Sequence, residues 1–308
     1  KLYKEHPEWA IQIPGREATE SRCQYVLDLS RPEVQDYAYE CVAKILRSAN
    51  IKYVKWDMNR QLSDLGSTYL DEDSQQELFH RYVLGMYAMQ ERLVQEFPDL
   101  LLENCSGGGA RFDPGMLYYS PQIWCSDDTD AIERLEIQEG TALIYPLCAM
   151  GAHVSVCPNH TVGRVTPFTT RGHVALAGTF GYELDITKLP EEERKLIPEQ
   201  TAMYHKYHEL IRDGEYYRIL SYRENHRSDC WAVASEDKSE VLVTYVQVLL
   251  GGEESRKVRL RGFDPAKKYR LEGTDEVYSG EMLMNAGFRM KDFWGDFVSR
   301  LYHFIAVD

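Results

Sequence analysis

A run of aromatic and β-branched residues at 53–56 leads directly into charged and polar side chains, which gives the stretch YVKWDMNR. The run predicts a strand, and alternate residues of a strand point to one face. Lys55 and Asp57 therefore share a face, and Asn59 joins them if the backbone stays extended. A cation beside Asp57 favours the ionised carboxylate, which is the form that a nucleophile requires. A structural ion pair is the competing interpretation.

A second acidic stretch, SDDTD at residues 126–130, also follows a predicted strand. Two carboxyl groups that face one pocket can serve as nucleophile and as general acid and base. Alternation does not choose between Asp127 and Asp128, because the chain turns there. Asp130 suits a cap or first-turn position of the next helix, and solvated capping acids are the structural alternative for all three.

A cysteine, a glycine loop and three histidines could also carry chemistry, but each has a simpler structural role. Cys105 precedes the loop SGGG, but no histidine lies at a telling distance, so a small residue lining a pocket is the favoured interpretation over a nucleophile. The glycines either admit a ligand close to the backbone or make a turn. His153, His160 and His173 do not follow HxH or HExxH spacing, so we predict neither a metal site nor a cofactor.

Composition narrows the class of protein. The 308 residues are 44% apolar and 27% charged, which suits one large domain and a smaller one. The formal net charge of −14 argues against nucleic acid or an anionic membrane as partner. No apolar run approaches the roughly 18 residues of a membrane span. Seven scattered cysteines without a CxxC pair predict reduced thiols and a cytoplasmic location.

Predicted helices and strands alternate along the first two thirds of the chain. The apolar patterns predict strands at 51–57, 100–105, 122–128, 152–159 and 180–186. They predict helices at 31–50, 73–97, 130–146, 167–178 and, with a break near Pro198, 189–219. Such alternation implies a parallel sheet, and polar residues at successive strand ends are typical of a (β/α) barrel. A doubly wound sheet is the rival, but neither GxGxxG nor a P-loop is present.

The strand count is smaller than a closed barrel needs. Residues 51–185 supply five strand–helix units, whereas a barrel has about eight. The chain also begins without Met, so we expect three strands upstream of Lys1. Beyond residue 225 the pattern alternates with period two, which predicts a small antiparallel β-sandwich. We therefore assign 1–224 to a partial catalytic barrel and 225–308 to a β-sandwich domain.

Several long motifs together resemble one enzyme family. YVKWDMNR, ENCSGGGARFD and WCSDDTDAIERLEIQEGTALIYP resemble catalytic motifs of the α-galactosidases of glycoside hydrolase family 36. HPEWAIQIPGRE, QYVLDLSRPEV, AHVSVCPNH and LEGTDEVYSGEMLMNAG extend the resemblance along essentially the whole chain. The implied fold is α/β, a (β/α)8 TIM barrel present as about its last five strand–helix units and followed by the antiparallel β domain.

The resemblance implies retaining hydrolysis of terminal α-1,6-linked galactose in melibiose and raffinose-type oligosaccharides, without cofactor or metal. By resemblance Asp57 is the nucleophile and Asp127 the acid/base. The sugar-binding positions of the family are matched by Arg22, Lys55, Asn59, Cys105, Gly107 and Gly108. The expected partners are galactose-containing oligosaccharides, with neither nucleic acid nor membrane, and the full-length parent is expected to be a homotetramer.

Two other functions are compatible with the resemblance, and the chain differs from the family in one respect, its length. A galactosyl transferase of the same family would share the two aspartates, whereas a non-catalytic carbohydrate-binding homologue would need neither Asp57 nor Asp127. The family's barrel begins before the position of Lys1, and an upstream acid pair that grips galactose lies there. We therefore expect the chain by itself to be inactive.

Overall fold

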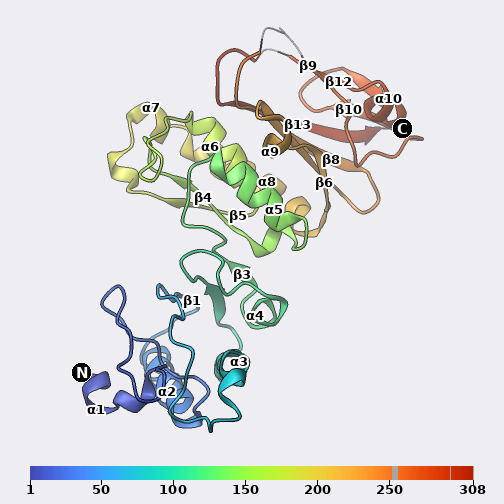
Figure 1. The fold of residues 1–308 in the computed structure, drawn as a ribbon. Coiled ribbons are helices and arrows are strands. Elements are labelled where there is room, and N and C mark those ends of the chain that lie inside the picture. The colour runs from blue at the N-terminus through green and yellow to red at the C-terminus, as the bar shows by residue number, and fades with distance from the viewer. Residues whose placement is uncertain (252–255, 292, 308) are drawn as a thin grey trace. The chain divides into compact units, whose positions relative to one another are not determined.

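The computed structural model describes residues 1–251, 256–291 and 293–307, and it divides into two compact units, Lys1–Trp124 and Cys125–Asp308 (Figure 1). Within the described residues, no helix is both long and apolar enough to cross a membrane. All seven cysteines are free thiols.

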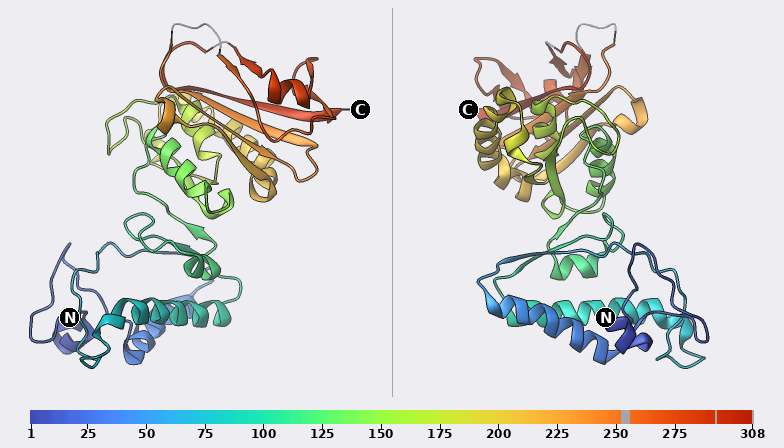
Figure 2. Two further views of the ribbon diagram at one scale, coloured as in Figure 1. Left: turned by 45° about the vertical axis from the view of Figure 1, so that its right-hand side comes forward. Right: turned by 90° about the vertical axis from the view of Figure 1, so that its left-hand side faces the viewer.

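The first unit is a small parallel sheet with helices. Its strands are β1 (Tyr53–Trp56), β2 (Leu101–Asn104) and β3 (Gln122–Ile123), paired in that order. Its helices are α1 (Leu2–Glu5), η1 (Pro7–Trp9), α2 (Pro32–Ser48), η2 (Gln75–Glu77), α3 (Leu78–Glu96) and α4 (Pro114–Tyr119). Pro32 lies in the first turn of α2, where its missing N–H costs nothing. The long helices α2 and α3 run beside each other and share one apolar core with the sheet (Figure 2).

The second unit begins with parallel strands and continues into an antiparallel sheet. Strands β4 (Gly151–Ser155) and β5 (Thr179–Glu183) pair in parallel. The helices are α5 (Glu133–Ala142), η3 (Leu147–Ala149), α6 (Phe168–Ala175), η4 (Ile186–Lys188), α7 (Glu191–Arg194), α8 (Ile197–Asp213), α9 (Tyr222–Asn225) and α10 (Gly280–Asn285). The five parallel strands expected from the sequence are thus present, although β3 is only two residues long. What fraction of a barrel they represent stays a prediction.

The C-terminal part forms a six-stranded antiparallel sheet in the order β11-β10-β13-β8-β7-β6, beside a two-stranded sheet β12-β9. These strands are β6 (Glu215–Leu220), β7 (Ser228–Ala234), β8 (Glu240–Gln247), β9 (Arg256–Val258), β10 (Lys268–Leu271), β11 (Val277–Ser279), β12 (Phe288–Met290) and β13 (Val298–Val307). The antiparallel sheet expected from the period-two pattern is therefore confirmed.

The large sheet is covered on both faces, which differs from a simple sandwich. Trp231 and Val233 of β7 pack with the helices α5, α6 and α8. Cys230 and Ala232, one residue out of phase, pack with β9, β12 and α10. Every residue of β7 is buried as a result. The helix core thus crosses the predicted boundary at 224/225, and that division into domains stays a prediction.

One predicted helix ends earlier than expected. The pattern at 189–219, with its break near Pro198, predicted helix as far as residue 219, but α8 ends at Asp213 and residues 215–220 form β6. Gly214 ends the helix: its N–H donates the last helical hydrogen bond, to the Leu210 carbonyl at 2.8 Å, and its backbone is then extended. An added Cβ would lie 2.4 Å from that oxygen. Glu215 and its successors then pair with β7, because tertiary pairing outweighs a weak helical pattern.

Candidate active site

Strand β1 places its alternate residues as the sequence predicted. Val54 and Trp56 are partly buried against the apolar core of the first unit. Tyr53 and Lys55 point to the other face, toward side chains of β2. The alternation delivers Lys55 and then Asp57 to the face that carries the polar groups.

The partner of Lys55 is not the one expected. Its Nζ lies 3.4 Å from Glu103 Oε1 and 4.6 Å from the ring centroid of Trp124. Glu103 is the direct neighbour of Lys55 across the β1–β2 pairing, and its side chain is 1% exposed. Lys55 therefore forms its ion pair with a buried carboxylate on the next strand, which argues against the structural ion pair with Asp57 that was the competing interpretation of this stretch.

Asp57 is kept ionised by other groups. Burial raises the pKa of its carboxyl, but hydrogen bonds from Asn59, from the Cys105 thiol and from the N–H groups of Met58 and Gly107 together lower it below the usual value. Asn59 Nδ2 donates to Asp57 Oδ2 at 2.5 Å. Hydrogen bonds that favour the charged form explain a lowered carboxyl pKa without a neighbouring cation.

The loop after β2 supplies two of these donors. Gly107 has φ +56° and Gly108 has φ +87°, values that residues with a Cβ rarely adopt. This backbone turns the Gly107 N–H toward Asp57. Burial, and then the Asp57 carboxylate, raise the pKa of Cys105, so its sulfur stays a neutral thiol that donates to Asp57. A neutral buried thiol is a poor nucleophile, which favours the pocket-lining role for Cys105.

Arg111 is a residue of this site that sequence reasoning missed. Its Nη2 donates to the carbonyl of Trp56 at 3.0 Å and to that of Cys105 at 2.8 Å. One guanidinium group thereby joins the ends of β1 and β2. Burial lowers the pKa of Arg111, while Tyr82 and Asp57 oppose that change. The basic residue two positions after the last glycine in SGGGAR was the available signal.

Arg22 reaches the same strand end from an earlier loop. Its Nη1 donates to the backbone carbonyl of Asn59 at 3.1 Å, and its own backbone has φ +53°. The first unit therefore brings together six of the predicted site residues: Arg22, Lys55, Asp57, Asn59, Cys105 and Gly107. Gly108 contributes through the turn, since its carbonyl accepts from the Ser106 N–H at 2.7 Å.

The acidic stretch 126–130 lies in the second unit. Asp127 is exposed. Asp128 Oδ1 accepts from the N–H of Asp130 at 3.0 Å, which gives Asp128 a part in the turn. Asp130 is 2% exposed, accepts from the N–H groups of Ile132 and Glu133, and pairs with Arg164. Asp130 thus has the structural role expected of it just ahead of α5.

The three histidines considered as metal ligands have separate surroundings. His153 Nδ1 lies 3.4 Å from Glu183 Oε2, and His160 is exposed. His173 is partly buried, loss of solvent around its ring lowers its pKa to about 4, and its Nδ1 lies 2.8 Å from Ser299 Oγ. Neutral His173 therefore takes part in packing α6 against β13.

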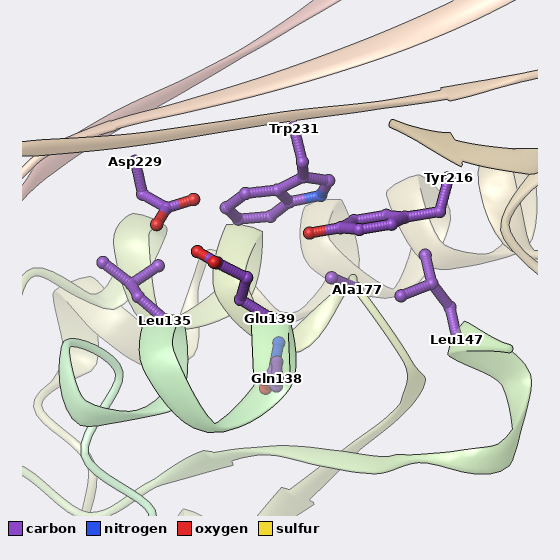
Figure 3. Close-up of a pocket in the computed structure, with 8 residues that line it drawn as sticks. All are labelled: Leu135, Gln138, Glu139, Leu147, Ala177, Tyr216, Asp229 and Trp231. Atoms are coloured by element: carbon purple, nitrogen blue, oxygen red, sulfur yellow. The ribbon is translucent and has the colours of Figure 1, made fainter. Parts of the chain in front are cut away.

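The described residues of the second unit line a small cavity and a larger open groove. One lies between α5 and the strands β6 and β7 (Figure 3), and its lining is Leu135, Gln138, Glu139, Leu147, Ala177, Tyr216, Asp229 and Trp231. Its volume of about 10 Å³ suits a single water molecule and excludes a sugar ring. A larger open groove of about 810 Å³ runs along residues 256–263, and its described lining contains basic side chains but no carboxylate.

Two family models match the chain. The model described as Melibiase matches residues 1–214, and that of the Glycosyl hydrolase family 36 C-terminal domain matches residues 228–304.

Curated relatives match along the same length. Alpha-galactosidase AgaA of Geobacillus stearothermophilus is 48% identical over 308 residues, and alpha-galactosidase Mel36A of Lactobacillus acidophilus is likewise 48% identical over 308 residues. Each alignment covers 100% of this chain but 42% of the relative. The chain thus spans less than half the length of the relatives that it matches.

Solved structures agree with the fold. A substituted AgaA from G. stearothermophilus in complex with raffinose superposes with a TM-score of 0.95 at 48% identity, covering 100% of this chain and 43% of that one. The galactosidase domain of the alpha-galactosidase–sucrose kinase AgaSK superposes with a TM-score of 0.93 at 46% identity, covering 100% of this chain and 42% of that one.

Proposed function

This chain belongs to glycoside hydrolase family 36, and we propose that it carries the catalytic strand ends of a retaining α-galactosidase. The observation that supports the proposal most is the environment of Asp57. Its carboxylate is held ionised by hydrogen bonds from Asn59, Cys105 and two backbone N–H groups. A carboxylate prepared in this way suits attack on an anomeric carbon.

The relatives supply a second support for the pair Asp57 and Asp127. AgaA variants have been crystallised with raffinose and with stachyose, and each carries a replaced aspartate besides a shared alanine-to-glutamate change. The two replaced aspartates lie 70 positions apart in that protein, which is also the separation of Asp57 and Asp127 here. Replacement of catalytic acids is a common way to keep a substrate intact in a crystal.

We assign the roles as follows. Asp57 Oδ attacks the anomeric carbon of the terminal galactose, while Asp127 gives its proton to the glycosidic oxygen as the bond to the aglycone breaks. Asp127 then removes a proton from water, which attacks the same carbon, releases α-galactose and frees Asp57. Asp128 and Asp130 accept hydrogen bonds from backbone N–H groups of the turn ahead of α5, which gives both of them a structural role there.

The substrates we propose are α-1,6-linked galactosides of the melibiose and raffinose type. Raffinose and stachyose complexes of AgaA support this class. Lys55, Asn59, Arg22 and the Cys105–Gly108 loop are proposed to contact the sugar. A homotetrameric parent and a cytoplasmic location remain proposals of the same kind.

The stereochemistry of the first product tests the proposal. Proton NMR of melibiose hydrolysis by the whole protein should show α-galactose before mutarotation, because two displacements at one carbon restore its configuration. Appearance of β-galactose first would contradict the retaining mechanism. Longer galactosides as the main products at low sugar concentration would favour the alternative, a galactosyl transferase, and the absence of any turnover would favour a carbohydrate-binding protein.

A further inference from the structure

Glu103 is a charged residue in the middle of an apolar strand. It is 1% exposed, whereas LLLENC around it is otherwise the sequence of a buried strand. In the three-stranded sheet it pairs directly with Lys55 on β1 and with Gln122 on β3. Directly paired residues of neighbouring parallel strands lie on one face, so these three side chains form a row across the sheet.

The two oxygens of Glu103 have different partners. Oε2 accepts from the hydroxyl of Tyr53 and, at 2.7 Å, from Gln122 Nε2. Oε1 is buried without a hydrogen bond, and the ammonium of Lys55 lies 3.4 Å away. If Lys55 left, the charge of Glu103 Oε1 would remain buried without compensation, which is costly. The carboxylate therefore holds the lysine in place.

A competing partner for Lys55 lies two residues along the same strand. Asp57 is on the same face, and a lysine side chain is long enough to reach the next residue of that face. Arg111, a cation that also interacts with Asp57, is engaged with the carbonyls of Trp56 and Cys105. An ion pair with Lys55 would tie up lone pairs that Asp57 needs for attack.

We propose that Glu103 is a positioning residue, which holds the Lys55 ammonium away from Asp57 and presents it, together with the face of Trp124, to the hydroxyl groups of the bound galactose. The inference rests on the proposed function, because it assigns Asp57 as the nucleophile. Under this proposal, Glu103 on β2 fixes the position of the Lys55 ammonium, and the attacking carboxylate of Asp57 forms no salt bridge with Lys55.

The test is a double-variant cycle in the whole protein with nitrophenyl α-galactoside. Glu103→Gln should lower kcat/KM about tenfold, the scale of one charge-assisted hydrogen bond. Lys55 then moves toward Asp57, so the acidic limb of the kcat/KM profile, which reports ionisation of the free enzyme, should shift to lower pH. In the Lys55→Met background, Glu103→Gln should cause no further loss and no further shift.

A matched control is Glu96→Gln. Glu96 also accepts from a tyrosine hydroxyl and a cation, those of Tyr39 and Arg47, but away from the strand ends. The Glu96→Gln substitution should leave both kcat/KM and the acidic limb of its pH profile unchanged.

An unchanged acidic limb in Glu103→Gln, or losses that multiply in the double variant, would overturn the inference. If Glu103→Gln does not fold, the comparison of the double variant with Lys55→Met decides: equal kinetics support the proposal, and a further tenfold loss contradicts it. Wild-type protein without α-galactosidase activity would refute the proposed function instead.

Discussion

At the residue scale, the donors around Asp57 are neutral: an amide, a thiol and two backbone N–H groups. Neutral donors stabilise the negative charge without cancelling it, so the carboxylate remains able to attack. The sequence predicted the face that carries Asp57 and Asn59, because a period of two decides it. It did not predict the partner of Lys55, because which strand lies alongside β1, and in what register, depends on tertiary packing.

Glu103 and Arg111 were overlooked for a related reason. Glu103 is buried and Arg111 is partly buried, and each contacts groups that are distant in sequence: Lys55 for Glu103, and the carbonyls of Trp56 and Cys105 for Arg111. A charged residue inside an apolar run such as LLLENC is a signal that can be read from sequence, since burial of an unpaired charge is costly. The stretch LLLENC does not reveal which residue pairs with Glu103, because that partner, Lys55, lies on another strand.

The choice between Asp127 and Asp128 gives a prediction at this scale. Asp127→Ala should greatly slow melibiose hydrolysis and spare nitrophenyl α-galactoside, because a good leaving group needs little protonation. Added azide should restore turnover of the nitrophenyl substrate and yield galactosyl azide, as seen by chromatography. Asp128→Ala should leave the azide response at the wild-type level. The same signature in Asp128→Ala would move the acid/base role to that neighbour.

At the scale of elements, the seam between α5 and the large sheet encloses two carboxyl groups (Figure 3). Asp229 of β7 is buried and accepts from the Tyr222 N–H at 2.9 Å. Glu139 of α5 pairs with Arg218 of β6 at 2.7 Å, and its Oε2 is buried without a hydrogen bond. Burial, and less strongly the charge of Glu139, raise the pKa of Asp229 to about 7.

This seam should make stability depend on pH. The pKa of Asp229 is about 7 in the folded chain and near 4 when unfolded, so the folded state binds the extra proton. The contribution of Asp229 to the free energy of unfolding is therefore fully present at low pH, and it should fall by up to about 4 kcal/mol as pH rises toward and through 7. Asp229→Asn keeps an oxygen that can accept from the Tyr222 N–H. In urea unfolding, this variant should show a free energy of unfolding that changes less between pH 5 and pH 8 than that of the wild type.

The control for that prediction is Asp237→Asn. Hydrogen bonds from Ser239 and Ser235 lower the pKa of Asp237 to about 2, so its carboxyl is ionised throughout pH 5–8 in both states. Its replacement should shift stability equally at each pH and leave the slope unchanged. If the free energy of unfolding of Asp229→Asn depends on pH as steeply as that of the wild type, a group other than Asp229 causes the pH dependence.

Element boundaries show what sequence patterns can predict. Long amphipathic helices such as α2 and α3, and the antiparallel sheet beyond residue 225, were predicted because their periodicity is sustained. The short β6 was mistaken for helix, because EYYRIL has no strong period and its pairing with β7 decides its conformation. The covering of both faces of β7 was also not predicted, since an apolar run does not reveal what packs on each side.

At the scale of the whole molecule, β1 lies at one edge of its sheet among the described residues, with β2 as its neighbour. An unpaired strand edge is a template for association. We therefore expect residues 1–308, expressed alone, to self-associate in size-exclusion chromatography and to lack activity on nitrophenyl α-galactoside. A monodisperse and active monomer would show that the strands present suffice.

The central claim is that Asp57 forms a covalent bond with the sugar during turnover. Incubation of the whole protein with a fluorinated α-galactoside, whose glycosyl-enzyme is hydrolysed slowly, should trap that intermediate. Peptide mass mapping after digestion should then find the added sugar on the peptide that contains Asp57. A label on the peptide that contains Asp127, or continued turnover without any label, would contradict the account.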